Sequence, residues 1–169
     1  MEKKYTTSLD TRAVIGTLAL PVLIIVSLAF VVMADDEKKT MLHYPMPMII
    51  HGILLLVYGF CYAMRPISYT LSNDTLTINR LIENVRFRLE DVDKVEAIKK
   101  EDLRFVMRTF GNGGIFGYIG KYYHSNFGSM TWYATRLSNY VLITMKSGKK
   151  IILTPDDSSF VGDLASKIK

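Results

Sequence analysis

Residues 67–81, ISYTLSNDTLTINRL, decide the fold, because the chain changes here from helical to strand patterning. Leu76 and Ile78 alternate with polar residues, as in a strand with one buried and one exposed face. The polar run at 72–74, SND, favours a tight turn, since such side chains bond their own backbone. The stretch therefore predicts a β-hairpin and divides the chain into a helical part and a sheet part.

Two long uncharged segments precede this hairpin. Residues 13–33, AVIGTLALPVLIIVSLAFVVM, and residues 45–64, PMPMIIHGILLLVYGFCYAM, each reach the length of about 20 residues that a helix needs to cross a bilayer. Residues 34–44 between them are mostly polar and short in extent. We therefore expect an antiparallel transmembrane hairpin, preceded by an N-terminal segment at 1–12 and followed by a domain at 65–169.

Basic residues set the expected orientation of this hairpin. Arg12 precedes the first segment and Arg65 follows the second at once, and basic residues favour the cytoplasmic side of membrane helices. Lys38 and Lys39 in the intervening loop weaken the pattern. The interpretation is that residues 1–12 and 65–169 are cytoplasmic and that the loop is extracytoplasmic. The alternative is that the first segment is a cleaved signal peptide, although its apolar stretch exceeds the usual length of about 7–15 residues.

Five further segments of the sheet part show strand patterning and bring the predicted number of strands to seven. In the segment at 129–136, Met130, Trp132 and Ala134 share one face. Ser147 and Gly148 suit a short hairpin connection between the last two strands. The five segments are 85–92 VRFRLEDV, 94–101 KVEAIKKE, 129–136 SMTWYATR, 139–146 NYVLITMK and 149–154 KKIILT.

The end of the chain predicts a short amphipathic helix. Residues 155–157, PDD, end the last strand and offer an aspartate to cap the helix. Four apolar residues then recur at helical spacing, so their stripe is expected to close the sheet part like a plug. These residues are Phe160, Val161, Leu164 and Ile168.

Three segments resemble a known family. Residues 110–123, FGNGGIFGYIGKYY, residues 133–136, YATR, and residues 152–157, ILTPDD, resemble a bacterial family of membrane-anchored pleckstrin-homology-like (PH-like) domains. The resemblance implies a mainly β, α+β fold of two sheets with four and three strands, closed by a C-terminal helix, in the bacterial cytoplasmic membrane. It implies no catalytic residue. Residues 70–77, TLSNDTLT, lack the basic residues of an inositide-binding signature.

Glycine crowds into residues 108–120, RTFGNGGIFGYIG. A Walker phosphate loop is excluded, because Ile115 takes its first glycine position and Tyr122 follows Lys121. A dinucleotide-binding loop is excluded, because Phe116 takes its last glycine position. We therefore expect a glycine-aromatic loop that joins the two sheets. Its rings have three possible surfaces: the β domain itself, the bilayer interface and a protein partner.

Charge and aromatic residues define a candidate interaction surface. Residues 1–64 contain five basic and five acidic side chains, so the net charge of +5 belongs to the sheet part. Its basic residues are candidates to face anionic lipid headgroups, and the alternative is an ordinary solvated exterior. The candidate residues are Phe110, Phe116, Tyr118, Tyr122, Arg104, Arg108, Lys121 and Arg136.

No arrangement of residues predicts catalysis, a metal or a cofactor. His43, His51 and His124 are scattered and lack the spacing of a zinc site, and no nucleic-acid-binding signature occurs. His51 is a polar residue within the second apolar segment, where we expect a partner on the first. The sequence predicts a non-catalytic interaction or scaffold module that binds anionic lipid or an unidentified protein. The alternative is a subunit of a membrane enzyme, transporter or sensor complex, and the oligomeric state stays open.

Overall fold

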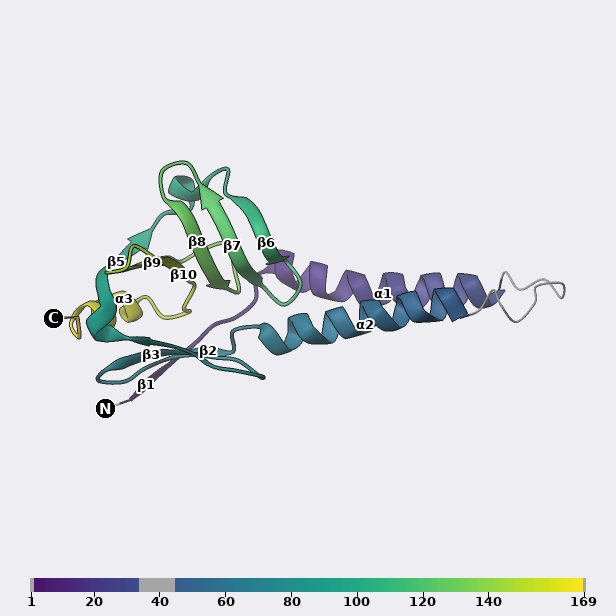
Figure 1. Cartoon of the computed structure of the whole chain (residues 1–169), viewed down its shortest axis with the longest axis horizontal. Helices are drawn as coiled ribbons and strands as arrows, with labels where there is room; N and C mark the ends of the chain where they lie inside the picture. The colour runs from purple at the N-terminus through teal and green to yellow at the C-terminus, as the bar shows by residue number, and fades with distance from the viewer. Residues whose placement is uncertain (1, 34–44, 169) are drawn as a thin grey trace.

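The computed structural model describes residues 2–33 and 45–168, so the expected loop at 34–44 lies outside the described residues. The chain begins with strand β1, Lys3–Thr6, and continues into helices α1, Thr11–Met33, and α2, Pro45–Met64. A β domain follows and ends with helix α3, Ser159–Ala165 (Figure 1). Its strands are β2 Ser68–Leu71, β3 Thr75–Asn79, β4 Val85–Arg88, β5 Val92–Ile98, β6 Met107–Gly113, β7 Tyr118–His124, β8 Gly128–Ala134, β9 Tyr140–Met145 and β10 Lys150–Leu153.

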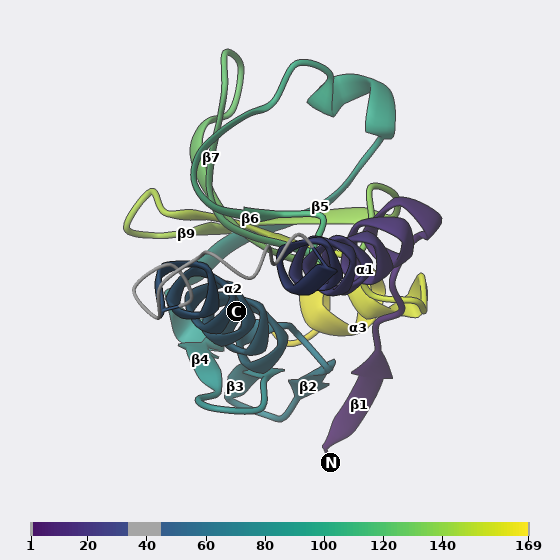
Figure 2. The same ribbon diagram turned by 90° about the vertical axis from the view of Figure 1, so that its right-hand side faces the viewer.

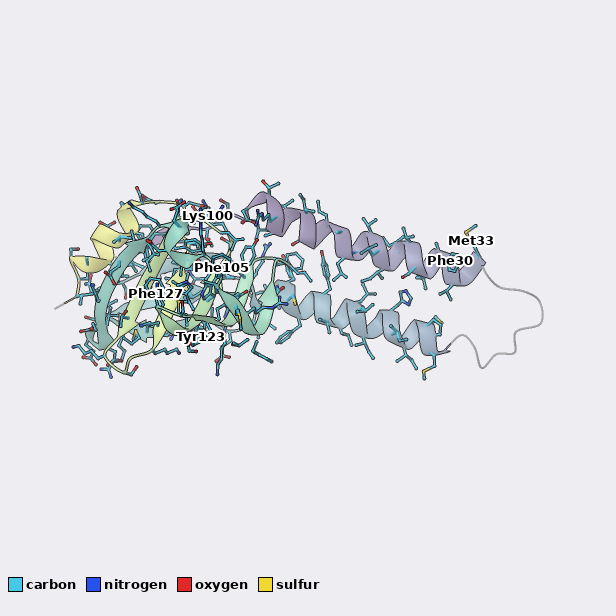
Figure 3. All side chains as sticks on the ribbon, turned by 90° about the horizontal axis from the view of Figure 1, so that it is seen from above. Phe30, Met33, Lys100, Phe105, Tyr123 and Phe127 are labelled. Carbon is cyan, nitrogen blue, oxygen red and sulfur yellow. The ribbon has the colours of Figure 1, made fainter. Side chains whose placement is uncertain are left out.

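Helices α1 and α2 lie side by side and project together from the β domain (Figures 1 and 2). Both are long and apolar enough to cross a bilayer, over residues 11–31 and 46–64. Their apolar side chains face outward: Phe30 is 74% exposed and Leu56 is 75% exposed. Figure 3 shows Phe30 and Met33 at the end of α1 that is far from the β domain. Two long apolar helices with exposed side chains suggest an association with a membrane.

The strands form two sheets. The first has the order β1-β2-β3-β4 and is antiparallel throughout. The second has the order β5-β9-β10-β8-β7-β6, in which β8 and β10 are parallel and the other neighbours are antiparallel. This arrangement confirms the mainly β fold with two sheets and a C-terminal helix.

The number of strands differs from the prediction. All seven predicted strands are present, but ten occur among the described residues, because β1, β6 and β7 are added. The second sheet has six strands where the family resemblance implied three, because it contains β6 and β7 and because β5 pairs with β9 in it. The glycine-rich segment was wrongly expected to be a loop, since it forms most of the hairpin of β6 and β7. Strand β1 is too short and too charged to show a pattern, and only Tyr5 in it is buried.

The main core lies between the two sheets and is closed by α3. Phe160 and Leu164 of α3 are fully buried there, and Val161 and Ile168 pack against the same cluster. This confirms the predicted apolar stripe. Tyr5 of β1 contacts Phe160 edge to face, with ring centroids 4.9 Å apart.

A second apolar cluster covers the other face of the six-stranded sheet. Ile151 and Leu153 belong to the main core while Ile152 belongs to the second cluster, as alternation along β10 requires. The second cluster is covered by Leu103 of the 3₁₀ helix η2, Lys100–Leu103, and by Ala13 of α1. Figure 2, viewed along the helices, shows the segment with η2 arching over this side, opposite the four-stranded sheet. Met130, Trp132 and Ala134 lie together in this cluster, which confirms their predicted common face.

The residues before α1 are built into the β domain. Strand β1 pairs with β2, from Lys3 opposite Leu71 to Thr6 opposite Ser68. The hydroxyl of Thr7 then donates a hydrogen bond of 2.8 Å to the carbonyl of Thr154. The chain segments before α1 and after α2 therefore belong to one sheet, and residues 3–6 form part of the domain that was expected to begin at 65.

Candidate functional site

The hairpin of β6 and β7 depends on two glycines that face each other across the strands. Gly111 is opposite Gly120, and both have positive φ, +114° and +134°. A Cβ atom on Gly111 would overlap the carbonyl oxygen of Ile119, and one on Gly120 would overlap that of Phe110. Only glycine permits this approach of the two backbones, so the glycines serve the fold.

The tip of this hairpin docks on the helices. The Phe116 N–H donates a hydrogen bond of 2.8 Å to the Thr17 hydroxyl of α1. The Phe116 ring lies 4.8 Å from the Tyr58 ring and 5.1 Å from the Tyr62 ring of α2, measured between centroids. Gly16 permits the contact, because a Cβ atom there would lie 2.8 Å from the Gly114 carbonyl oxygen. Phe116 is only 7% exposed, so its ring is used to join the β domain to the helices.

Next to this junction, the outer face of the six-stranded sheet carries a cavity of about 780 Å³. Four aromatic residues of β7, β8 and β9 form its floor, and residues 100, 101, 103–106 and 108 form its rim. Tyr122 stacks on Trp132 with centroids 4.5 Å apart, and Trp132 contacts Tyr140 at 5.5 Å. We call this cavity the basic-aromatic pocket; its principal lining residues are Arg12, Lys100, Arg104, Arg108, Tyr118, Tyr122, Trp132 and Tyr140.

The charge of the pocket is strongly one-sided. Arg12, Lys100, Arg104 and Arg108 line it, and Glu101 is the acidic residue among the lining side chains. The ion pairs found within residues 2–33 and 45–168 do not involve any of these basic side chains. Their charges are therefore available to an anion in the pocket.

The tyrosines of the floor are neutral at physiological pH. Burial, with the Asp10 carboxylate nearby, raises the pKa of Tyr118 to about 12. Burial also raises the pKa of Tyr122 to about 12, against the opposing charge of Arg108. The Tyr122 hydroxyl donates to the Asn112 carbonyl at 2.9 Å. The tyrosines themselves therefore carry no negative charge, and the carboxylate next to them is that of Asp10, which accepts a hydrogen bond of 3.3 Å from the Tyr118 hydroxyl.

Buried polar groups hold the basic residues in place. The His124 Nε2–H donates to the Arg104 carbonyl at 2.9 Å, and its Nδ1 accepts the Asn126 N–H at 3.2 Å. Asp10 accepts the Ala13 N–H at 2.7 Å and thus caps the first turn of α1, which carries Arg12. The pocket is therefore assembled from β6, β7, β8, β9, the η2 segment and the start of α1.

The predicted surface residues have four different settings, and the first is the docking of Phe116 on the helices. Arg104, Arg108, Tyr118 and Tyr122 come together in the basic-aromatic pocket. Phe110 and Lys121 are exposed on β6 and β7 and do not line it.

Arg136 belongs to the anchor of the N-terminal segment. Its guanidinium forms an ion pair with Asp156, and it donates a hydrogen bond of 2.6 Å to the Ser8 hydroxyl. Asp157, the second aspartate of the PDD run, accepts the Ser159 N–H at the start of α3 at 2.8 Å. The two aspartates therefore have structural partners.

Sequence reasoning missed four residues of the pocket, Arg12, Lys100, Trp132 and Tyr140. Arg12 was used only to orient the helices, and Trp132 only to define a strand face. A signal was present in the concentration of aromatic residues in the second half of the chain, but it did not show that they share one face. The pairing of β8 with β10 brings them together.

His51 has the interhelical partner that was expected. Its Nε2 lies 2.7 Å from the Ser27 hydroxyl of α1, and its Nδ1–H donates to the Pro47 carbonyl at 2.6 Å. Within residues 2–33 and 45–168, no group of three His, Cys, Asp or Glu residues is placed to hold a metal ion.

Comparisons with known proteins place the β domain in a family. The model of the bacterial PH domain family matches residues 67–168, from the start of β2 to the end of α3 and its following turn. Comparisons with curated proteins and with solved structures gave no match. Strand β1 and both apolar helices lie outside the matched residues.

Proposed function

The chain belongs to the bacterial PH domain family, and from this premise we propose that it is a membrane-anchored, non-catalytic interaction module at the cytoplasmic face of the membrane. PH domains are in general non-catalytic and often bind lipids or proteins. The proposal includes both helices as membrane spans, with residues 65–169 and the N-terminal segment on the cytoplasmic side.

One observation carries this proposal: β1 and β2 pair in one sheet although both apolar helices separate them in sequence. If both helices cross the bilayer, this pairing requires the N-terminal end of α1 and the C-terminal end of α2 to lie on the same side of it. Arg12 and Arg65 at these ends support the cytoplasmic side, because basic residues favour that side of membrane helices. The docking of Phe116 on both helices then holds the domain directly against the membrane surface.

The topology can be tested by cysteine labelling in intact cells. Cys61 is the single cysteine, so Cys61→Ser gives a background without thiols. Ser147→Cys, on an exposed turn of the domain, should react with a membrane-impermeant maleimide only after the cells are permeabilised. Lys38→Cys should react in intact cells. Labelling of Ser147→Cys in intact cells would contradict the proposal.

The interaction role needs a second measurement. Affinity capture of the full-length protein from native membranes, with bound proteins and lipids identified, should reproducibly yield a co-purifying protein or lipid. The double variant Arg104→Gln/Arg108→Gln serves as the comparison for the pocket, and Lys121→Gln/Lys146→Gln removes equal charge elsewhere. A co-purifying protein or lipid that is recovered equally with the wild type and with both double variants does not bind the pocket.

A further inference from the structure

We propose that the basic-aromatic pocket binds the phosphate group of an anionic phospholipid from the adjacent membrane leaflet. This inference rests on the proposed function in one respect, because it requires α1 and α2 to be in the bilayer. It assigns a site to the anionic-lipid binding that the sequence suggested, and it locates this site away from residues 70–77, which carry no basic side chain.

The charges of the pocket fit a phosphate. Arg12, Arg104 and Arg108 come from the start of α1, the end of η2 and strand β6, and they line one cavity without ion-pair partners among the described residues. Guanidinium groups bind phosphate oxygens through paired, charge-assisted hydrogen bonds. Three arginines from separate elements that line one cavity supply the positive charge that recognition of an anion requires.

The place of Arg12 favours a lipid over a soluble anion. Arg12 is the second residue of α1, and the uncharged run of that helix begins at the next residue, Ala13. Thr17, which bonds the hairpin tip, lies about 9 Å further along the helix than Thr11 at a rise of about 1.5 Å per residue. The hairpin tip thus contacts the helix within its apolar part, and the pocket beside Arg12 lies at the level expected for headgroups.

Exposed apolar side chains next to the arginines fit the same ligand. Phe105 lines the pocket, is 94% exposed, and has a φ of +62° that is unfavourable for a residue with a side chain. Met107 is 65% exposed at the start of β6. Figure 3 shows Phe105 and Lys100 on neighbouring parts of the domain. Backbone strain at an exposed aromatic residue whose side chain is not packed against the domain is typical of a binding surface. A lipid offers phosphate to the arginines and acyl chains to these residues.

The floor of the pocket contains a donor without a partner. Trp132 is 2% exposed, and its indole Nε1–H is buried with no hydrogen-bond partner among the described atoms. Buried donors in native proteins are nearly always paired, so an unpaired one requires an explanation. The nitrogen itself is covered by protein atoms, so Trp132 contributes to the site as the ring that supports Tyr122 on the floor of the pocket. The cavity of about 780 Å³ is of the size of small-molecule sites, which occupy about 300–1,000 Å³.

Trp132 also provides the test, because it is the single tryptophan of the chain. Full-length protein is reconstituted into vesicles of phosphatidylcholine that contain increasing fractions of phosphatidylglycerol, and the tryptophan emission is recorded. We expect a saturable change of emission with phosphatidylglycerol. Arg104→Gln/Arg108→Gln should shift its midpoint about tenfold or more, because two charge-assisted contacts are lost. Lys121→Gln/Lys146→Gln, exposed and outside the pocket, should keep the wild-type midpoint.

Three results would overturn the proposal. The first is wild-type emission that does not depend on phosphatidylglycerol, a result that requires no variant to fold. The second is an equal midpoint for the two double variants, with melting curves showing both folded. The third is a saturable change of emission when inorganic phosphate is added to protein in pure phosphatidylcholine vesicles, at concentrations equal to those of phosphatidylglycerol that give the lipid response. This result would show that the ligand is a soluble anion. Flotation of the same samples distinguishes the membrane anchor from the lipid-binding pocket. Protein that does not float with the vesicles contradicts the membrane anchor. Protein that floats but shows no change of emission with phosphatidylglycerol contradicts only the pocket.

Discussion

The N–H of Phe116 donates a hydrogen bond of 2.8 Å to the hydroxyl of Thr17, which joins the tip of the β6–β7 hairpin to helix α1. A backbone donor at this position has no strand partner, so the helix hydroxyl satisfies it within a buried contact. The Phe116 ring is held at the same point between Tyr58 and Tyr62 of α2. The β domain is therefore fixed to both apolar helices, which a flexible tether after Met64 would not achieve.

Phe116→Ala should loosen this junction. Removal of a buried phenylalanine ring destabilises a protein by about 3–5 kcal/mol, and the loss here should fall at or below the lower end, because Tyr58 and Tyr62 can close part of the gap. Thermal unfolding in detergent should show a lower melting temperature. Phe110→Ala is the matched control, since Phe110 is 76% exposed on the same hairpin. Equal melting temperatures for the two variants would contradict the docking.

Gly111→Ala should disrupt the hairpin itself. The new methyl group would overlap the Ile119 carbonyl, and the φ of +114° is unfavourable for alanine, so we expect a loss well above the cost of about 1–2 kcal/mol for a left-handed residue alone. Gly128→Ala is the control, because Gly128 has a φ of +69° and open space around it. Denaturant unfolding of both variants measures the difference. A smaller loss in Gly111→Ala than in Gly128→Ala would exclude a role for close backbone approach.

The predictable part of the fold is the part encoded by local periodicity. Leu76 and Ile78 in β3, and Phe160 and Leu164 in α3, carry the alternation or helical spacing that burial on one face produces, and all four are fully buried. Strand β1 was not predictable, because it forms by pairing with β2, which follows both apolar helices in sequence. The β6–β7 hairpin was hidden by glycine, which normally weakens strands but here allows Gly111 and Gly120 to face each other.

The sequence predicted which kinds of residue form the basic-aromatic pocket, but not which residues come together in it. Arg104, Arg108, Tyr118 and Tyr122 were singled out for charge and aromatic character, which a sequence displays directly. Their joint placement beside Arg12 depends on long-range contacts: the start of α1 packs on the outer face of the six-stranded sheet. The parallel pairing of β8 with β10 is likewise a feature of topology, and no periodicity within either strand encodes it.

His51→Ala should have a small effect if the helices serve as an anchor. The imidazole bonds Ser27 across the helix pair, and hydrogen bonds between membrane helices contribute about 0.6 kcal/mol on average. We expect a slightly lower melting temperature in detergent and an unchanged lipid response of the Trp132 emission. Ser27→Ala, which removes the same bond from the other helix, should match it. A large loss of an activity in cells for His51→Ala, with no such loss for Ser27→Ala, would favour the alternative of a transporter or enzyme subunit.

Acid should weaken the anchor of β1 on α3. The Asp163 carboxylate accepts a hydrogen bond of 2.5 Å from Tyr5 and forms an ion pair of 2.5 Å with Lys3. The hydrogen bond from Lys3, followed by that from Tyr5, lowers the pKa of Asp163 below its ordinary value of 3.8. Because the pKa is lower in the folded state, the resulting stabilisation is present above pH 3.8 and is lost as the pH falls through the lowered pKa.

The measurement is the free energy of unfolding between about pH 2 and pH 7 for the wild type and Asp163→Asn. The wild type should be the more stable protein at neutral pH, and the difference should shrink below pH 3.8, where its carboxylate takes up a proton. Asp157→Asn is a useful control, because the pKa of Asp157 is also lowered, chiefly by the Ser159 N–H and less by the charge of Lys3, while its hydrogen bond is made within the start of α3. Both variants should therefore flatten the acid limb of the stability curve, but only Asp163→Asn should expose β1 to proteolysis at neutral pH. Protection of β1 in Asp163→Asn equal to that in the wild type would show that strand pairing with β2 holds the N-terminal segment without this carboxylate.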